Sequence, residues 1–293
     1  MAREIYQAIV DGILIGGVYA LMAVGLTLIF GVLDIINIAQ GILVVLGAYL
    51  SYGLAARLHI DLFVGLLITV PAMFVLGVAI QWSFIRPLRG RERTSMTLLV
   101  SYAIALIIEG ILYEVAGPNV RELNAWYVTS SVRVFGFYLS YIYLYGFALA
   151  LVLVAGIYLL LYRTGFGRSV RATMQDETAA RLVGIDTNRV AALTFGIGVA
   201  VTAAGGMMFG ATNGGFNPNS GYDLISRLLA IIILGGLGSI GGALAASVFM
   251  LTLQSLVDIW QPQWATAVFY AALVLVLLIR PTGFFGRAPV RAQ

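Results

Sequence analysis

The sequence predicts an all-α polytopic membrane protein, and three observations carry that prediction. Hydrophobic residues make up 61% of the chain and charged residues 10%, whereas a soluble globular protein has about 45–50% and about 25%. Uncharged apolar stretches follow one another along the chain, and a transmembrane helix needs about 20 such residues. At that length per helix, the 293 residues hold about eight to nine membrane elements and leave no room for a second globular domain.

The apolar stretches define eight candidate helical segments. In chain order they cover residues 5–30, 38–56, 62–85, 95–115, 138–162, 189–211, 225–258 and 264–280. The segment 225–258 is too long for a single span. Its path therefore depends on which side of the membrane the flanking connections occupy.

The connections between these segments differ in their content of arginine. Four arginines lie in 86–94, five in 163–189 and three from Arg280 onward, so the positive-inside rule predicts that these connections are cytoplasmic. The connections expected on the opposite side are 57–61, 116–137, 212–222 and 259–263. Two simple passes before 57–61 would place the amino terminus outside, whereas a re-entrant break near Asp34 would place it inside. We favour the outside.

Two interruptions are expected within the spans. Because 212–222 and 259–263 share one side, 225–258 must be a hairpin, and its arms are expected to meet at the glycine-rich turn 235–242. The other interruption, 31–41, is polar and separates two apolar stretches. Interrupted helices in both halves of a membrane protein indicate a transport site built on an internal repeat. The glycines expected to act as hinges are Gly31, Gly41, Gly235, Gly236, Gly238, Gly241 and Gly242.

Polar residues inside the apolar stretches are candidates for a substrate pathway, because a charge at the bilayer centre costs roughly 2.5–3.5 kcal/mol. Asp34, Asn37 and Gln40 are spaced three residues apart, so they could line a cavity or could cap the second helix at a water interface. Glu109 could hold a proton or a substrate amine, or could form a hydrogen bond to a neighbouring helix. Asn213 completes the predicted pathway set.

The long connection 163–188 is predicted to contain a helix that lies outside the membrane. No proline or glycine interrupts the chain from Ser169 to Val183, and Gly184 follows at a favoured helix-terminating position. Such a helix could dock in the groove of a partner protein, or could rest on the lipid headgroups as a plain connection. The residues predicted to make this contact are Arg171, Asp176, Glu177, Ala179, Ala180, Arg181 and Gly184.

The composition excludes several classes of function. Cysteine is absent and His59 is the only histidine, which excludes thiolate catalysis and metal sites built from these residues. All 17 basic residues are arginine, so the chain has no P-loop lysine for ATP. The arginines fall mainly between the apolar stretches, which argues against a nucleic-acid partner. We therefore expect no catalytic residues, metal site or cofactor in this chain, and an energy source on another subunit.

The predicted cytoplasmic helix resembles the coupling-helix motif of importer-type ABC permeases, in which Glu-Ala-Ala is followed by glycine. Ala179, Ala180 and Gly184 keep the spacing of that motif, while Glu177 is displaced by one residue. Nearly the whole chain resembles the LivH-type permease subunit of the branched-chain amino acid ABC transporter family. The stretches that carry this resemblance are 17–31, 37–49, 235–242 and 280–286. The chain departs from the family pattern of His, Gly and an acid, because it has Gln40, Gly41 and Ile42 there.

The resemblance implies a single permease domain over residues 1–293, with 163–188 as its coupling-helix loop, in the inner membrane. It implies translocation of branched-chain or other hydrophobic amino acids, or of a related amide or urea. It also implies a heterodimer with a LivM-like second permease, two cytoplasmic ABC ATPase subunits that hold ATP and Mg, and a periplasmic substrate-binding protein. The alternative is an autonomous ion-coupled carrier or channel for a small polar solute, with Glu109 and Asp34 as its ion or proton sites.

Overall fold

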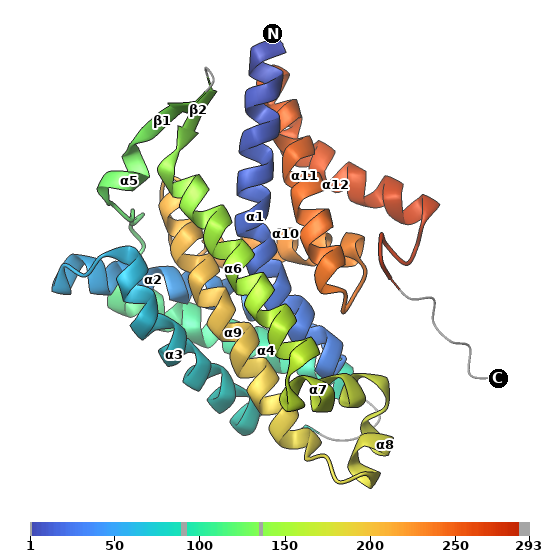
Figure 1. Cartoon of the computed structure of the whole chain (residues 1–293). Helices are drawn as coiled ribbons and strands as arrows, with labels where there is room; N and C mark the ends of the chain where they lie inside the picture. The colour runs from blue at the N-terminus through green and yellow to red at the C-terminus, as the bar shows by residue number, and fades with distance from the viewer. Residues whose placement is uncertain (1, 89–92, 135–136, 287–293) are drawn as a thin grey trace.

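The computed structural model describes residues 2–88, 93–134 and 137–286, which form a bundle of long helices (Figure 1). Eight of the described helices are long and apolar enough to cross a membrane, which confirms the predicted all-α polytopic fold. These are α1 (Ala2–Leu33), α2 (Gln40–Leu58), α3 (Leu62–Ile80), α4 (Arg93–Ala116), α6 (Tyr141–Arg163), α9 (Thr187–Thr212), α11 (Ile240–Trp260) and α12 (Pro262–Ile279). The shorter elements are the π-helical turn η1 (Gln81–Ile85), α5 (Trp126–Thr129), α7 (Gly165–Gln175), α8 (Glu177–Leu182), α10 (Ser220–Gly235), β1 (Ser131–Val134) and β2 (Phe137–Ser140).

The boundaries of the helices agree with the predicted segments to within three residues, except that α10 begins at Ser220, inside the predicted connection 212–222. The segment 225–258 divides into α10 and α11, which confirms the hairpin and its glycine turn. The helix predicted from residue 138 begins only at Tyr141, because 137–140 forms strand β2. This strand pairs antiparallel with β1, with Ser131 opposite Ser140. Valine fills two of the four positions of β1 and aromatic residues fill two of the four of β2, and these residue types favour strands.

The two ends of the bundle carry different elements. The start of α1 and the β1–β2 hairpin lie together at what we call the outer end (Figure 1), where Gln7 Nε2 donates to the Tyr138 carbonyl at 2.7 Å. Helices α7 and α8 lie at the opposite, inner end. If the arginine-rich connection around α7 and α8 is cytoplasmic, as predicted, the amino terminus is outside, as we favoured. Four of the arginines on which the orientation rests lie outside the described residues: Arg89, Arg91, Arg287 and Arg291.

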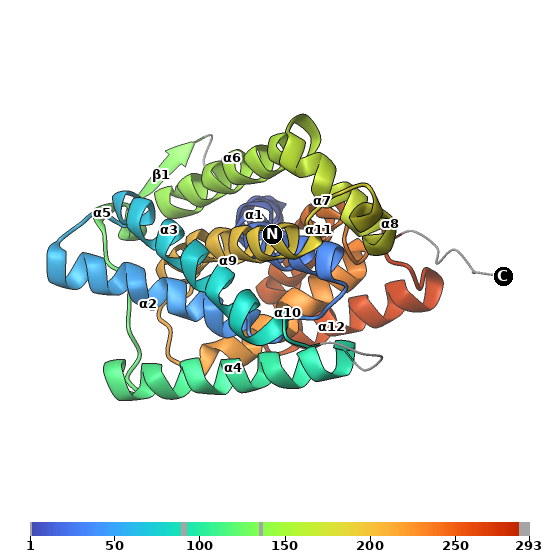
Figure 2. The same ribbon diagram turned by 90° about the horizontal axis from the view of Figure 1, so that it is seen from below.

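The core of the bundle is built around α1 and α9. In Figure 2 these two helices run through the middle of the molecule, and α4 lies along its edge. The most apolar part of α9 is 83% buried and that of α1 is 78% buried, whereas the other membrane-length helices reach 50% at most. Small residues allow α9 to pack closely against α2. A Cβ on Gly206 of α9 would lie 2.1 Å from the carbonyl oxygen of Val44 in α2. The backbones of α2 and α9 therefore touch directly.

An aromatic cluster joins the outer connections. The rings of Phe63, Trp126, Tyr127, Tyr141 and Tyr145 contact one another with centroids 5.5–6.0 Å apart. Tyr127 is buried, and its hydroxyl donates to the Asp61 carboxylate at 2.8 Å. Burial raises the pKa of Tyr127 above its usual range, and the hydrogen bond to Asp61 raises it further. These ring contacts and this hydrogen bond hold the connections of the outer end together.

Candidate functional site

The first interruption separates α1 from α2 and brings two buried amides into contact with α9. Asn37 Nδ2 donates to Gln40 Oε1 at 3.0 Å, Gln40 Nε2 donates to the Thr202 hydroxyl, and Thr202 donates to the Gly198 carbonyl at 2.8 Å. Asn37 is 1% exposed and Gln40 is 0% exposed. These side chains therefore fasten the start of α2 to the middle of α9.

Asp34 does not join this group. It ends α1 with a left-handed φ of 54°, its N–H donates to the Phe30 carbonyl at 2.9 Å, and its side chain is exposed. Asp and Asn tolerate this backbone conformation better than most residues. Asp34 thus ends α1 and does not cap α2, whose N-cap position is Ala39 without a side-chain hydrogen bond, so the capping alternative was wrong. A pathway role for Asp34, Asn37 and Gln40 stays a prediction.

Replacing Gln40 by leucine should destabilise the chain, because Asn37 and Thr202 each lose a buried hydrogen-bond partner. The cost of leaving such groups unsatisfied is about 1–3 kcal/mol. We expect a lower apparent melting temperature for purified Gln40→Leu, measured as the loss of the monodisperse peak on size exclusion after heating. Gln263→Leu is the matched control, since Gln263 is exposed and its side-chain amide bonds to the neighbouring Gln261. Equal melting of both variants would contradict a structural role for Gln40.

Glu109 is hydrogen-bonded to a neighbouring helix. Its side chain is 9% exposed, and Oε2 accepts from the Tyr222 hydroxyl at 2.6 Å. Tyr222 lies in the first turn of α10, so this contact joins α4 to α10. Of the roles open to Glu109 from sequence, the structure shows the hydrogen bond between helices.

The second interruption is a tight glycine turn between α10 and α11, covering residues 236–239. Gly236 and Gly238 have φ values of 95° and 80°, which favour glycine. The hydroxyl of Ser239 accepts from the Gly242 N–H at 3.1 Å and so begins α11. Gly235 and Gly242 pack against each other at the crossing of the two helices, whereas Gly241 faces open space. A hinge motion at these glycines stays a prediction.

Three distant segments meet this turn at the inner end. Phe284 N–H donates to the Leu234 carbonyl at 2.7 Å and Phe285 N–H to the Gly235 carbonyl at 3.1 Å. Gly31, near the end of α1, lies against Gly238, and the Met174 side chain of α7 packs beside Gly31. The end of α1, the glycine turn, α7 and residues 280–286 therefore form one contact region. Gly41 lies elsewhere, against Gly221 at the start of α10.

The predicted cytoplasmic helix is in fact two helices, which corrects the uninterrupted stretch expected from Ser169 to Val183. Asp176 is extended, with φ −157°, and its carboxylate accepts from the N–H groups of Thr178 and Ala179 at 2.8 and 2.9 Å. An aspartate that caps a helix in this way starts a new helix without proline or glycine. Gly184 follows α8 with φ 85°, as its terminating role predicted.

Several predicted contact residues are engaged within the chain. Arg171 donates to the Leu161 carbonyl and lies over the Tyr162 ring. Arg181 pairs with Glu177 at 2.5 Å, and Ala180 is buried while Ala179 is exposed. The large apolar side chains exposed here are Leu182 at the end of α8 and Val183 directly after it, which are 84% and 76% exposed. Two large apolar side chains at the tip of a charged loop are suited to contact another protein.

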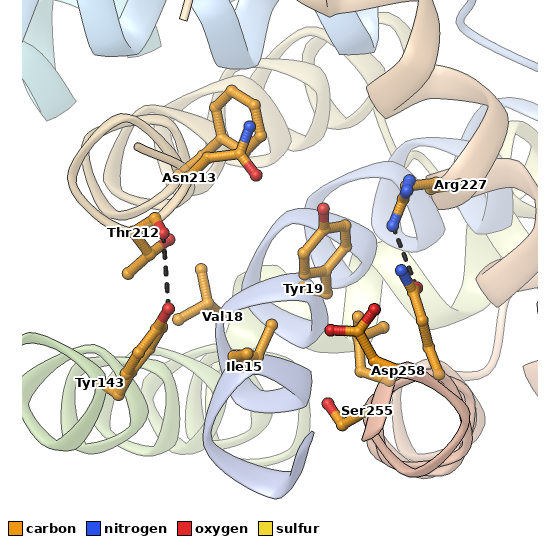
Figure 3. Close-up of a pocket in the computed structure, with 12 residues that line it drawn as sticks. Ile15, Val18, Tyr19, Tyr143, Thr212, Asn213, Arg227, Ser255 and Asp258 are labelled. Atoms are coloured by element: carbon orange, nitrogen blue, oxygen red, sulfur yellow. Dashed lines mark hydrogen bonds between the residues drawn. The ribbon is translucent and has the colours of Figure 1, made fainter. Parts of the chain in front are cut away.

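Asn213 lines a polar cavity that the sequence did not predict. This cavity, of about 190 Å³, lies near the outer end among α1, α6, α9, α10 and α11 (Figure 3). Its polar lining includes Tyr19, Arg227 and Asp258, and Arg227 Nη1 donates to Gln254 Oε1 at 3.1 Å. We call it the Arg227 cavity. Arg227 could have indicated this cavity from the sequence, because it is the one arginine inside segment 225–258, where a charge is costly.

A wider hollow lies at the outer end, beside the Arg227 cavity. It has a volume of about 750 Å³ and shares three lining residues with the cavity, Ile15, Ser255 and Asp258. Its own lining adds charged residues from the first turns of α1, including Glu4 and Asp11. The two spaces therefore form a funnel that narrows from the outer end toward Arg227.

Comparisons with known proteins agree on one family. Residues 8–278 match the family model described as the permease component of branched-chain amino acid transport systems. The chain is 30% identical to the high-affinity branched-chain amino acid transport system permease protein BraD of Pseudomonas aeruginosa, over 98% of both chains. It is 28% identical to LivH of Escherichia coli, over 97% of this chain and 96% of LivH. It is 26% identical to LivM of Salmonella typhimurium, over 91% of this chain and 67% of LivM. No solved structure matches the chain.

Proposed function

The chain belongs to the family of permease components of branched-chain amino acid transport systems, and from this we propose that it forms half of the pathway of an ATP-driven importer. The solute is a branched-chain or other hydrophobic amino acid, and the membrane is the inner membrane of the cell. The match of the family model over residues 8–278 is the observation that carries this proposal. As a permease component, the chain moves a solute and is not itself an enzyme.

Two cytoplasmic ATPase subunits supply the energy in this proposal, and they hold ATP and Mg. The exposed Leu182 and Val183 of α8 support a contact with a groove on such a subunit, since apolar helix residues commonly fill grooves of this kind. The salt bridge between Arg181 and Glu177, and the hydrogen bond from Arg181 Nε to Thr187 at 2.8 Å, hold α8 on the start of α9. A short helix braced in this way would transmit a push from the ATPase.

The second half of the pathway would come from a homologous permease. The similarity of the chain to LivM supports a LivM-like partner, because it shows that two related permease proteins exist among branched-chain amino acid transport systems. A periplasmic substrate-binding protein would deliver the amino acid to the outer end. The funnel that narrows toward Arg227 opens in that direction.

Alternating access is the mechanism that we propose. Closure of the ATPase subunits would move α7 and α8, and α7 touches the end of α1 through Met174 and Gly31. Gly31 in turn lies against Gly238, in the turn between α10 and α11. Movement at the inner end would thereby reach the helices that surround the Arg227 cavity.

Co-purification tests this proposal directly. A tagged chain solubilised in mild detergent is expected to bring down a homologous permease and ATPase subunits, identified by mass spectrometry. Proteoliposomes that contain the assembly should take up leucine only with ATP. A chain that purifies alone and moves solute without ATP would instead establish the ion-coupled carrier, for which Glu109 and Asp34 would be the first sites to change.

A further inference from the structure

We propose that the Arg227 cavity binds the zwitterionic head group of an aliphatic α-amino acid, with the carboxylate on Arg227 and the ammonium facing Asp258. This inference rests on the proposed function, because it names the place where the transported solute is held within this chain. Three properties of the cavity support it: a guanidinium with unused N–H donors, a carboxylate on the side of the outer end, and an aliphatic wall. Each of them comes from a different set of helices.

Arg227 supplies the anion-binding group. It is half-buried on α10, and its guanidinium carbon lies 5.7 Å from the centre of the Phe269 ring. Gln254 takes one of its five N–H donors and the Tyr19 hydroxyl interacts with another, which leaves donors for a ligand. Within the described part of the chain no carboxylate lies at ion-pairing distance from it. A cation in a membrane-spanning bundle is costly without an anion. A carboxylate fits this site, because its two oxygens match the guanidinium fork.

Asp258 supplies the opposite charge at the mouth. It lies near the end of α11 and lines both the Arg227 cavity and the wider hollow. Asp258 is exposed, and in Figure 3 its carboxylate borders the same space as Tyr19 and Arg227. The wider hollow is lined by three acidic residues and by Arg3, so a solute that enters from the outer end passes a mainly acidic lining before it reaches Arg227. This order of charges orients a zwitterion with its carboxylate inward.

The remaining wall is aliphatic and aromatic. Ile15 and Val18 of α1, Leu251 of α11 and Phe209 of α9 line the cavity beside the polar groups. A volume of about 190 Å³ holds roughly twelve water-sized atoms, if each needs about 15 Å³. That is enough room for a small branched amino acid. An inorganic anion would leave this wall and Asp258 unused, so the lining favours a zwitterion with an apolar side chain.

The test uses three ligands that differ only in their head group: leucine, leucinamide, which lacks the carboxylate, and 4-methylpentanoate, which lacks the amine. Binding is measured by isothermal titration with the purified transporter assembly in detergent, without the binding protein. The unaltered assembly should bind leucine best. Arg227→Gln should weaken leucine about ten- to a hundredfold and leave leucinamide unchanged, since a charge-assisted hydrogen bond is lost. Asp258→Asn should weaken leucine and leave 4-methylpentanoate unchanged.

Control variants separate binding from folding. Arg133→Gln and Glu122→Gln remove charges from exposed positions of the outer connections and should bind all three ligands as the unaltered assembly does. Arg227→Lys keeps the positive charge, and should retain most of the preference for leucine over leucinamide if Arg227→Gln proves unstable. A merely structural role for Arg227 would weaken all three ligands together, and this outcome would overturn the proposal.

Uptake distinguishes failure of this site from failure of the proposed function. If the unaltered assembly shows no ATP-dependent uptake of any amino acid, the proposed function fails. If uptake depends on ATP but leucine binding is the same in Arg227→Gln, Asp258→Asn and the unaltered assembly, the proposed function stands and the Arg227 cavity is not the site.

Discussion

Exchange of Leu182 and Val183 for glutamate is expected to reduce ATP-dependent uptake to background while the chain still folds and inserts. Both side chains project from the end of α8 into solvent, at 84% and 76% exposure, so the substitutions disturb little within the chain. If they fill a groove on an ATPase subunit, their loss removes about 1.5–3 kcal/mol each. Together that is a hundredfold or more in affinity, at about 1.4 kcal/mol per tenfold.

The measurement is the yield of ATPase subunits in a pull-down of the Leu182→Glu, Val183→Glu double variant, together with uptake in proteoliposomes. Val120→Glu is the control, because Val120 is 60% exposed but lies in a connection at the outer end. It should bind the ATPase subunits and transport as the unaltered chain does. Full ATP-dependent uptake by the double variant would show that the energy reaches the permease by another surface.

A large effect on folding is expected from Gly206→Ala. The added methyl carbon would lie 2.1 Å from the Val44 carbonyl oxygen and 3.0 Å from the Ala48 nitrogen, both in the backbone of α2. Backbone atoms have no alternative rotamer, so α2 and α9 must separate, and the hydrogen bond between Gln40 and Thr202 is lost with them. Overpacking of this kind costs about 3 kcal/mol or more, a large part of the stability of a typical domain.

Gly110→Ala is the matched control for this substitution. Gly110 also lies inside a long helix, α4, but its Cβ position meets no other atom within 4 Å. Alanine there should be neutral or should stabilise by up to about 1 kcal/mol, because it restricts the unfolded backbone. We expect a fluorescent fusion of Gly206→Ala to give little monodisperse protein on size exclusion, whereas Gly110→Ala gives the normal amount. Equal yields would contradict the close contact of α2 with α9.

The spans could be predicted from the sequence because each depends on local composition alone. A run of apolar residues must be helical in a membrane whatever its neighbours are, and 189–211 became α9 with a shift of two residues at its start. The break at Asp176 was missed because it depends on one capping side chain, and the prediction considered only proline and glycine as breakers. Local chemistry therefore sufficed for element type, but not for every boundary.

The Arg227 cavity could not be predicted because it exists only between helices. Tyr19, Asn213, Arg227 and Asp258 come from different elements, and no pattern of spacing within one element brings them together. Asn213 was named from the sequence, but its neighbours depend on how α1, α9, α10 and α11 pack. The amides of Asn37 and Gln40 differ, because they lie three residues apart in one stretch of chain and Asn37 donates to Gln40. The equal spacing of Asp34 and Asn37 brings no such contact, since Asp34 is exposed.

The contact between residues 280–286 and the glycine turn has a consequence for the order in which the chain is built. The last carbonyl groups of a helix have no partner within that helix, and those of Leu234 and Gly235 are satisfied by the N–H groups of Phe284 and Phe285. These donors are translated some fifty residues later, after α11 and α12. These two carbonyl groups therefore gain their partners only when nearly all of the described chain has been synthesised. A nascent chain halted at α11 would have both carbonyl groups without these donors, close to the end of α1.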